Sequence, residues 1–313
     1  MLNRPPVTWK KDTGLSHPLG LLTLLVPSAR EACTETELRV LETALSAKEV
    51  ETRRVSLGKD PAAVVRREIA AGARYVAVCG SQSALATVIA AIVDSDEDVV
   101  LGVFPGSRPN DFARTFGLRN NPETSTMSLA RPDVMPVDIG VVTCLDASGK
   151  PLRRYLLNDA VVGLGAVVSR RQQRLRRLGR VGGLLGWWST LAAYRPRRTD
   201  VDMVFAQWHD RAVQVRISNG QFAHDGLHIA PRALPDDGVW DVQVWDGPRH
   251  LPFTLQPKML LSDHLPHRHI STWRQKRVEV TSTPPSPVAV DDIFVGTTPA
   301  TFELLPKKLR LKV

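Results

Sequence analysis

Cysteine is scarce in this 313-residue chain: it has only Cys33, Cys79 and Cys144. Three thiols cannot build the disulfide framework of a small secreted protein, so we expect a protein of the reducing cytosol. Long apolar runs are also missing, since Leu21–Val26 is far shorter than the roughly 20 residues of a membrane-spanning helix. The N-terminus does not have the pattern of a secretory signal peptide. These features predict a cytoplasmic location.

Acidic residues are fewer than basic ones, 32 against 41, which gives a net charge of +9. A basic excess favours an anionic partner, such as a nucleotide, a nucleic acid or a membrane surface. Because no nucleic-acid-binding module is recognisable, charge alone does not support that class. Hydrophobic residues make up 43% of the chain and charged residues 23%, which excludes a disordered protein.

The first part of the chain, residues 1–133, alternates strand-like and helix-like segments. Short apolar runs such as Tyr75–Val78 and Val99–Phe104 alternate with helical patterns such as Ser83–Val93. Helix starts are marked by Thr34 with Glu37, spaced as a capping box, and by Asp60 before a proline. This alternation predicts βαβ units and a parallel sheet.

The second part, residues 134–304, has short strand patterns separated by turn residues. Examples are Val137–Cys144, Tyr155–Val162, Val201–Gln207 and Thr301–Leu305. They predict a β-sandwich with one helical insertion over residues 168–194 and a tail, residues 305–313, that packs back on the first domain. We expect ligands in a cleft between an α/β domain and a β domain.

Three stretches could carry chemistry. Cys79 to Ala84 joins a buried strand to a helix, where backbone N–H groups suit phosphate; the alternative is a plain turn with Ser83 as the helix N-cap. Phe104 to Arg114 follows the next strand, and there Asn110 and Asp111 either orient a hydroxyl or a metal-bound water or only cap a helix. Asn219 to Gly238 is rich in glycine and acids, which suits either a hard cation or a hairpin turn.

These three stretches, in this order, resemble the diacylglycerol kinase catalytic-domain family, the bacterial soluble lipid kinases. The resemblance covers roughly residues 18 to 313 and includes further ordered motifs, among them Pro136–Gly140, Leu157–Asn158, Gly163–Ala166, Ile229–Pro231 and Val290–Asp291. It implies a two-domain lipid-kinase and NAD-kinase-like fold, α/β plus β-sandwich. It also implies ATP- and Mg²⁺-dependent transfer of a γ-phosphate to a lipid hydroxyl.

The two phosphate loops depart from the family pattern. Its Gly-Gly-Asp-Gly-Thr loop corresponds to residues 79–83, so that Ser81 replaces the metal-organising Asp and Gln82 replaces a glycine. Its Gly-Thr-Gly-Asn-Asp motif corresponds to residues 107–111, where Pro109 removes an N–H donor. The resemblance makes these residues the candidate nucleotide ligands: Gly80, Ser81, Ser83, Ser107, Arg108 and Asn110.

The catalytic base is also missing. The family's Asp-Gly-Glu, whose Glu is the general base, corresponds to Asp291-Asp292-Ile293, and Ile293 cannot accept a proton. Asp111 and Asp292 are the remaining candidate catalytic carboxylates, although in a strand Asp292 would point away from the side of residue 293. Because a general base is worth about 10²–10⁴ in rate, this loss argues against efficient transfer.

A structural Mg²⁺ site is preserved in the sequence. By resemblance, Asp237 supplies its carboxylate, and Leu234 and Val239 supply main-chain carbonyls. The catalytic Mg²⁺ site is in doubt, because Ser81 has replaced its carboxylate.

A basic and aromatic stretch follows Ser169. It is typical of a helix that lies on an anionic membrane, where cations attract headgroups and Trp anchors at their level. The alternative is that Trp187 packs on the sandwich while the arginines are solvated. The candidate membrane residues are Arg174, Arg176, Arg177, Trp187 and Trp188.

The sequence therefore predicts a lipid-kinase-like protein with weak or absent phosphotransfer that binds nucleotide or lipid as a regulatory component. It would lie in the cytoplasm or peripherally on the inner face of the membrane. The alternative is an active kinase for a diacylglycerol or sphingoid lipid. Whether the chain forms a homodimer stays open.

Overall fold

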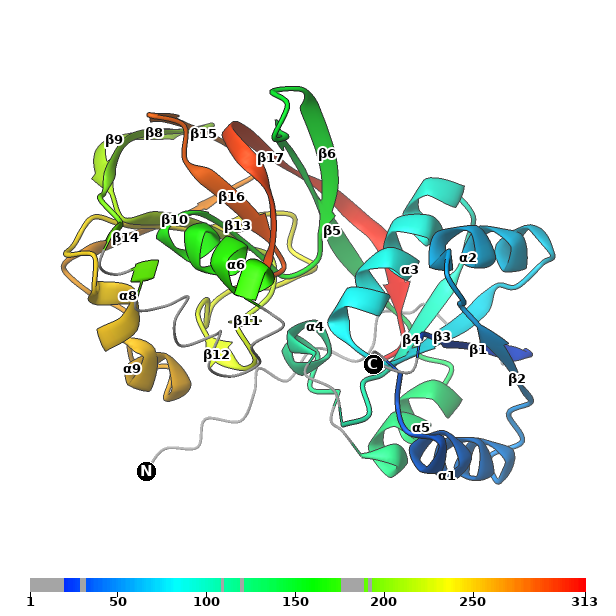
Figure 1. Ribbon diagram of the computed structural model, residues 1–313. Helices are drawn as coiled ribbons and strands as arrows, with labels where there is room; N and C mark the ends of the chain where they lie inside the picture. Colours follow the sequence, from blue (N-terminus) through cyan, green and yellow to red (C-terminus); the bar gives the residue numbers. More distant parts are fainter. Residues whose placement is uncertain (1–19, 29–31, 108–109, 119–120, 176–188, 191–192) are drawn as a thin grey trace. The chain divides into compact units, whose positions relative to one another are not determined.

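The computed structural model describes residues 20–28, 32–107, 110–118, 121–175, 189–190 and 193–313 (Figure 1). These residues form two compact units. One contains the described residues up to Val137 together with Lys307–Val313, and the other contains Asp138–Pro306. No helix in the described part of the chain is long and apolar enough to cross a bilayer.

The first unit is built on a parallel sheet. Two of its strands, β3 (Tyr75–Cys79) and β4 (Val100–Phe104), are buried at every residue, as expected for strands covered on both faces. The end of β17 (Ile293–Leu311) pairs with β4, with Arg310 opposite Val100. The strand order is β2 (Thr52–Ser56), β1 (Leu22–Val26), β3, β4 and the end of β17.

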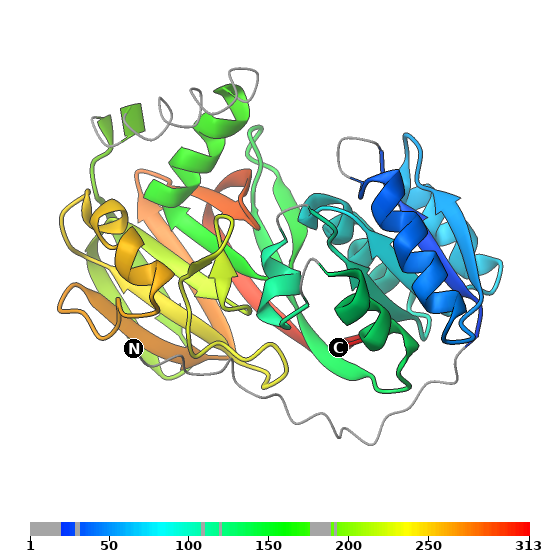
Figure 2. The same cartoon turned by 90° about the horizontal axis from the view of Figure 1, so that it is seen from below.

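Helices cover both faces of this sheet (Figures 1 and 2). The helices α1 (Glu35–Ser46) and α5 (Pro122–Ala130) pack together, as do α2 (Pro61–Ala70) and α3 (Gln82–Ser95). The predicted capping box between Thr34 and Glu37 is present, and Asp60 caps α2. A short helix, α4 (Asp111–Thr115), follows β4 along the chain.

The second unit is an antiparallel β-sandwich in which β17 takes part in two sets of strands. Its residues 293–297 pair with β16, and its residues 300–303 pair with β15. The first set is β14 (Ile270–Gln275), β13 (Trp240–Trp245), β10 (Gln214–Ser218), β7 (Asp159–Gly163), β16 (Pro287–Val290) and β17. The second set is β6 (Pro151–Leu156), β5 (Met135–Leu145), β17, β15 (Arg277–Thr283), β8 (Arg197–Met203) and β9 (Ala206–Ala212). The predicted α/β plus β-sandwich fold is confirmed.

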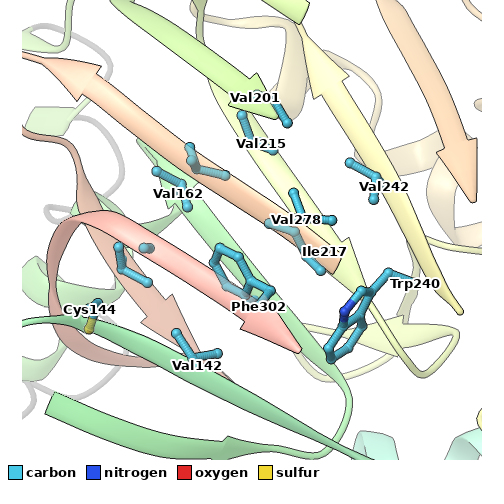
Figure 3. Close-up of a cluster of buried hydrophobic side chains, with 14 of the residues drawn as sticks. Val142, Cys144, Val162, Val201, Val215, Ile217, Trp240, Val242, Val278 and Phe302 are labelled. Atoms are coloured by element: carbon cyan, nitrogen blue, oxygen red, sulfur yellow. The ribbon is translucent and has the colours of Figure 1, made fainter. Parts of the chain in front are cut away.

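The core of the sandwich gathers the inward-facing side chains of both strand sets (Figure 3). Trp240 and Phe302 are fully buried there. Gly140 makes room for Trp240, because a Cβ at this position would lie 2.3 Å from the indole ring. Most of the other buried side chains in this core are valines, with smaller numbers of other apolar residues, as expected for strands packed against one another. All three cysteines are buried free thiols.

Several predicted elements of the second unit have different bounds. The strand expected at residues 155–162 is two strands, because the backbone N–H groups of Leu157 and Asn158 donate to Asp291 instead of to a neighbouring strand. The strand expected at residues 201–207 likewise turns between β8 and β9. The predicted insertion helix begins earlier, as α6 (Leu164–Leu175). Elements that the sequence did not indicate are β11 (Phe222–Ala223), β12 (Leu227–His228), α8 (Leu251–Thr254), α9 (Gln256–Leu260) and β14.

A buried lysine gives the first unit a pH-dependent stability. Lys312 is fully buried, donates to the carbonyl of Arg131 and lies 5.3 Å from the centre of the Tyr75 ring. Burial lowers the pKa of Lys312 to about 8. Between this value and the ordinary lysine pKa of about 10.4, the unfolded chain binds more protons than the folded chain, so stability rises with pH.

We therefore expect the native chain to gain about 2 kcal/mol of unfolding free energy, relative to Lys312→Met, between about pH 7 and pH 10. Urea unfolding of both proteins at the two pH values measures this difference. Parallel pH profiles for the native chain and the variant would show that Lys312 keeps an ordinary pKa.

Candidate functional site

The loops after β3 and β4 lie side by side in the first unit. The backbone N–H of Gly80 donates to the carbonyl of Phe104 at 3.0 Å. After Gly80, the side chain of Ser81 accepts from the N–H of Ala84 at 3.4 Å and so caps α3. The expectation that Ser83 is the cap is therefore wrong by two residues, because the helix begins at Gln82.

Gln82 ties the first loop to α4. Its Oε1 accepts from the backbone N–H groups of Asp111 at 2.8 Å and of Phe112 at 3.3 Å. Asn110 Oδ1 accepts from the N–H of Ala113 at 2.9 Å, so side-chain oxygens satisfy three consecutive N–H groups at the start of α4. The motif pattern marks Gln82 only as a replaced glycine, and the signal that it misses is the length of this side chain, whose amide can hydrogen-bond across the two loops.

Asn110 and Asp111 are both buried. In addition to capping α4, the Nδ2 of Asn110 donates to the carbonyl of Gly80 at 3.5 Å. Asp111 Oδ1 lies 3.7 Å from Nε of Arg114, one turn along the same helix. The structure thus brings Gly80, Asn110 and Asp111 together, as the motif comparison indicated.

Glu37 places a carboxylate beside the second loop. Its Oε2 accepts from the N–H of Thr34 at 2.7 Å and from the Thr34 hydroxyl at 2.8 Å. Burial raises the pKa of Glu37, but hydrogen bonds from Thr34 and Ser107 outweigh this and hold the pKa below its usual range. Gly106 adopts φ +56°, and a Cβ there would lie 2.4 Å from Cys33 Sγ, so this loop packs closely on its neighbours.

In the second unit, a buried ion pair joins β7 to β10. Arg216 pairs with Asp159, and Ser218 Oγ donates to Asp159 Oδ1 at 2.7 Å. Both charged side chains are only 5% exposed. Each of these buried charges is stabilised by the other, because removing one leaves the other buried without a compensating charge.

A histidine and an aspartate extend this cluster. The ring nitrogen Nδ1 of His224 lies 2.6 Å from Asp292 Oδ1. The backbone N–H of His224 donates to Asp292 Oδ2 at 3.2 Å. On its other side, His224 Nε2 is 3.5 Å from Nη1 of Arg216. Burial disfavours the charged form of both groups, but their attraction outweighs it and leaves the pKa of His224 raised and that of Asp292 lowered.

The two neighbours of Asp292 in the sequence, Asp291 and Ile293, differ in their surroundings. The Asp291 carboxylate accepts from the N–H groups of Leu157, Asn158 and Asp159 at 2.9, 2.9 and 3.2 Å. Burial raises the pKa of Asp291 to about 7 in spite of these hydrogen bonds. Ile293, at the position of the family's glutamate, is 44% exposed.

Asp237 has protein partners of its own. Its Oδ2 pairs with Arg274, and its Oδ1 accepts from the N–H of Val239 at 3.1 Å. The carbonyl of Leu234 accepts from the N–H of Asp237 at 3.4 Å. Among the described residues, no three His, Cys, Asp or Glu side chains form a metal-binding group. The predicted Mg²⁺ site has only one such side chain, Asp237, and its other ligands are the backbone carbonyls of Leu234 and Val239. This finding therefore does not test it, and the site stays a prediction.

Several candidate residues lie outside the described part of the chain. Arg174 is exposed near the end of α6. The membrane role assigned to it also stays a prediction. The candidates outside the described residues are Arg108, Arg176, Arg177, Trp187 and Trp188.

The buried ion pair generates a stability prediction. Arg216→Met leaves the Asp159 charge buried without its partner, so we expect a loss of about 3–5 kcal/mol in unfolding free energy at neutral pH. The double variant Arg216→Met with Asp159→Asn should recover most of this loss, because the amide that replaces the carboxylate carries no charge and still accepts from Ser218. Urea unfolding of the native chain, Arg216→Met, Asp159→Asn and the double variant forms a double-mutant cycle. Additive losses in the double variant would contradict the proposed dependence of one charge on the other.

Comparison with known proteins identifies the two parts of the chain. The model of the diacylglycerol kinase catalytic domain matches residues 21–142, and the model of the YegS C-terminal, NAD kinase β-sandwich-like domain matches residues 159–313. Proteins described as probable lipid kinase YegS-like are similar in sequence. The one from Pseudomonas fluorescens is 26% identical over 199 residues, 63% of each chain, and the one from Pseudomonas savastanoi is 29% identical over 206 residues, 63% of this chain and 62% of that relative. The match thus spans less than two thirds of the length of these curated relatives.

Solved structures agree in fold. A putative diacylglycerol kinase from Bacillus anthracis superposes with a TM-score of 0.70 over 94% of this chain and 96% of that one, at 19% identity. Another diacylglycerol kinase structure from the same organism gives a TM-score of 0.69 at 18% identity. At such identity the likeness concerns the fold alone. The two consecutive domain matches, together with this fold, show that the chain belongs to the diacylglycerol kinase family of lipid kinases.

Proposed function

We propose that this chain is a lipid-kinase-family protein in which phosphotransfer is impaired and which binds nucleotide or lipid as a regulatory component. The observation that carries the proposal is the pair of hydrogen bonds from the N–H groups of Asp111 and Phe112 to Gln82 Oε1. In the family pattern a glycine stands at the position of Gln82, and it has no side chain with which to occupy these donors.

Phosphoryl transfer depends mainly on positioning the phosphates and neutralising their charge. The free N–H groups at the start of a helix are suited to this, because they donate to an anion. Here an amide oxygen already accepts from two of them and Asn110 from a third. A phosphate would have to displace these oxygens before it could use the same donors.

Charge near the two loops also opposes phosphate binding. Ser81 offers a hydroxyl, engaged in capping α3, where the family has a metal-organising carboxylate. Glu37 adds a carboxylate that accepts hydrogen bonds from Ser107, one of the candidate nucleotide ligands. Ser81 thus lacks the charge of a metal ligand, and the Glu37 carboxylate places a negative charge next to the loop that would have to hold the negatively charged phosphates.

Proton removal from a lipid hydroxyl lacks its usual group. Ile293 cannot accept a proton, and Asp291 is held by three backbone N–H groups. A general base contributes about 10²–10⁴ in rate. Loss of the base together with the loop carboxylate supports weak or absent transfer more strongly than either change alone.

The residues of the predicted structural Mg²⁺ site suit a divalent ion. Asp237 offers a carboxylate, and the carbonyls of Leu234 and Val239 offer further oxygens, which is the donor set that Mg²⁺ accepts. In the described structure Arg274 holds Asp237 Oδ2, so binding of an ion there would require Arg274 to move.

The proposal is tested by restoring the glycine. Gln82→Gly frees the N–H groups of Asp111 and Phe112, so we expect it to tighten binding of Mg²⁺–ATP about tenfold or more, as measured by calorimetry. We expect neither the native chain nor the variant to phosphorylate diacylglycerol, sphingosine or ceramide with radiolabelled ATP, because Ile293 is unchanged. Gln82→Asn, too short to span the same distance, is the matched control for removal of the hydrogen bonds.

Lipid phosphorylation by the native chain tests directly whether phosphotransfer is impaired. Turnover of any of these lipids that disappears in Asp111→Ala would contradict impaired transfer. Equal Mg²⁺–ATP affinity of the native chain and Gln82→Gly would show that Gln82 does not block the donors.

A second candidate, an active lipid kinase, is favoured by the His224–Asp292 pair. A carboxylate 2.6 Å from Nδ1 holds an imidazole in one orientation, and such a pair can take a proton from a hydroxyl. In that case His224 Nε2 would receive the proton of the lipid hydroxyl once the Arg216 guanidinium, 3.5 Å away, has moved aside, and Asp292 would stabilise the resulting imidazolium. His224 is 21% exposed, so the ring is partly accessible.

If the chain is an active kinase of this type, His224→Gln should lower the turnover number by about 10²–10⁴. Asp292→Asn should lower the kinetic pKa of the same step, because it removes the charge that raises the pKa of His224. Lipid phosphorylation measured against pH checks both effects. His209→Gln, in the exposed strand β9, is the matched control and should leave turnover unchanged. Turnover that survives His224→Gln would exclude His224 as the base.

A further inference from the structure

Two histidine side chains connect the end of α9 to the short strand β12. Nε2 of His264 donates to the carbonyl of Ile229, which directly follows β12, at 3.0 Å. His228, in β12, forms a hydrogen bond through Nδ1 with the hydroxyl of Ser262. Helix α9 also packs on β12, and Figure 1 shows these two elements in gold and yellow. The two imidazoles thus link two parts of the second unit that are distant in the sequence.

Each imidazole leaves its second ring nitrogen without a hydrogen bond. His264 is 1% exposed, and its Nδ1 is buried with no hydrogen-bond partner in the described part of the chain. Nε2 of His228 is buried in the same way. A protonated imidazole carries a hydrogen on both nitrogens. Each ring, if protonated in place, would therefore hold a buried N–H group for which the described residues offer no acceptor, and this costs free energy.

Burial and nearby cations oppose a positive charge on His264. Burial has the largest effect and lowers its pKa, and repulsion by Arg216 and His267 acts in the same direction. Arg216 is a fixed cation, because it is only 5% exposed and is paired with Asp159. The hydrogen bond from Nε2 and the carboxylate of Asp263 favour the charged form, but they do not outweigh burial.

His224 shows which partner His264 lacks. Arg216 repels a charge on either ring. His224 Nδ1 has the carboxylate of Asp292 at 2.6 Å, and for this reason the pKa of His224 is raised in spite of burial. His264 has a neutral carbonyl as its partner instead. Protonation is therefore stabilised at one histidine beside Arg216 and resisted at the other.

His228 is also held in its neutral form. Its ring stacks on that of Phe222, with ring centres 4.5 Å apart, which adds burial and no charge. Burial, followed by repulsion from His264, lowers the pKa of His228 to about 4. The two histidines thus resist protonation by the same physical causes, and a charge on either one makes a charge on the other less favourable.

Helices α8 and α9 are short, and an apolar row fixes them. Leu251, Leu255 and Met259 are buried in a cluster with Ile229 and Trp245. Proteins open locally in small cooperative units whose stability is well below that of the whole domain. Two short helices held by one apolar row and by the two histidine links have the properties of such a unit.

We propose that His228 and His264 form an acid-sensitive switch that releases the α8–α9 segment, residues 251–264, from the sandwich when the pH falls below neutral. In the closed form both rings are uncharged and hold the end of the segment against β12. In the open form water solvates the imidazoles, which then take up protons that the closed form excludes. Acid shifts the equilibrium toward the open form, because that form binds more protons.

The pH range follows from the proton affinities of the two forms. An imidazole in water has a pKa of about 6.5, so the open form gains protons below this value. In the closed form His228 gains its proton only near pH 4. Opening therefore increases as the pH falls between these two values, and His264, whose pKa is lowered as well, adds to the effect.

Hydrogen exchange of the full chain, followed by mass spectrometry at about pH 7.5 and about pH 5, measures this opening. Rates are corrected for the intrinsic effect of pH on exchange. We expect the opening of residues 251–264 in the native chain to rise about tenfold or more at the lower pH. Strand β15, in the same unit, should show no comparable rise. On return to the higher pH the protection should recover.

Variants assign the effect to the two histidines. In the double variant His228→Gln with His264→Gln, the opening should be nearly equal at both pH values, because neither side chain titrates. Each single variant, which disturbs the fold less, should show a smaller rise than the native chain. His250→Gln is the matched control and should keep the native rise, since His250 is exposed directly before α8 and makes no capping hydrogen bond through its side chain.

Three outcomes would overturn the proposal. One is equal opening of residues 251–264 in the native chain at both pH values. Another is a full native rise in both single variants, which would assign the effect to other groups. The last is an equal rise in β15, which would mean that acid loosens the whole unit. These outcomes depend neither on Mg²⁺–ATP nor on lipid, so the proposal goes beyond the proposed function and fails or stands separately from it.

Discussion

The hydrogen bonds from the start of α4 to Gln82 are the interaction on which the arrangement of the two loops in the first unit depends. Open N–H groups at a helix start attract an anion, whereas donors that already have acceptors do not. The distances of 2.8 and 3.3 Å from Gln82 Oε1 to two consecutive amide nitrogens show that the side chain acts as a built-in acceptor. Residues 81 and 82, at the positions of the family's phosphate loop by motif resemblance, here cap α3 and hold two loops together.

The same principle holds in the second unit, where charges find partners inside the protein. Asp159 pairs with Arg216, Asp292 with His224, and Asp237 with Arg274. A carboxylate serves a metal or a substrate only when it is not already neutralised, because displacing a protein cation costs free energy. These three ion pairs each join residues that are distant in the sequence, so they contribute to the specificity of the fold as well as being candidates for chemistry.

The sequence predicted the fold well where local signals and burial agree. The apolar strands β3 and β4, the capping box at Thr34 and the cap at Asp60 follow from short-range chemistry, and the structure has all of them. The bounds of strands were predicted less well where a residue distant in the sequence determines them. Asp291 lies more than 130 residues from Leu157 and Asn158, yet it ends one strand and begins the next by taking their N–H groups.

The candidate site was predicted in part for the same reason. Motif order placed Gly80, Asn110 and Asp111 together, because loops that follow neighbouring parallel strands must meet at one edge of the sheet. The partners of Gln82 and Asp292 could not be deduced, since they depend on how far a side chain reaches across loops. His224 has a φ of +52° and lies within the stretch Asn219 to Gly238, but no motif in that stretch assigns it a role, and only the three-dimensional arrangement connects it to Asp292.

A fold of this kind can outlast its chemistry because the two depend on different residues. The sandwich core around Trp240 and Phe302 and the sheet of the first unit are independent of what stands at positions 81, 82 and 293. Ser81 is a good helix cap and Gln82 satisfies N–H groups that would otherwise await a ligand, so both replacements favour stability over binding. Active sites normally tolerate unsatisfied donors and crowded charges because function requires them. At the start of α4 the N–H groups of Asp111, Phe112 and Ala113 are satisfied by side-chain oxygens of the chain itself, so this part of the loop is stable without a ligand.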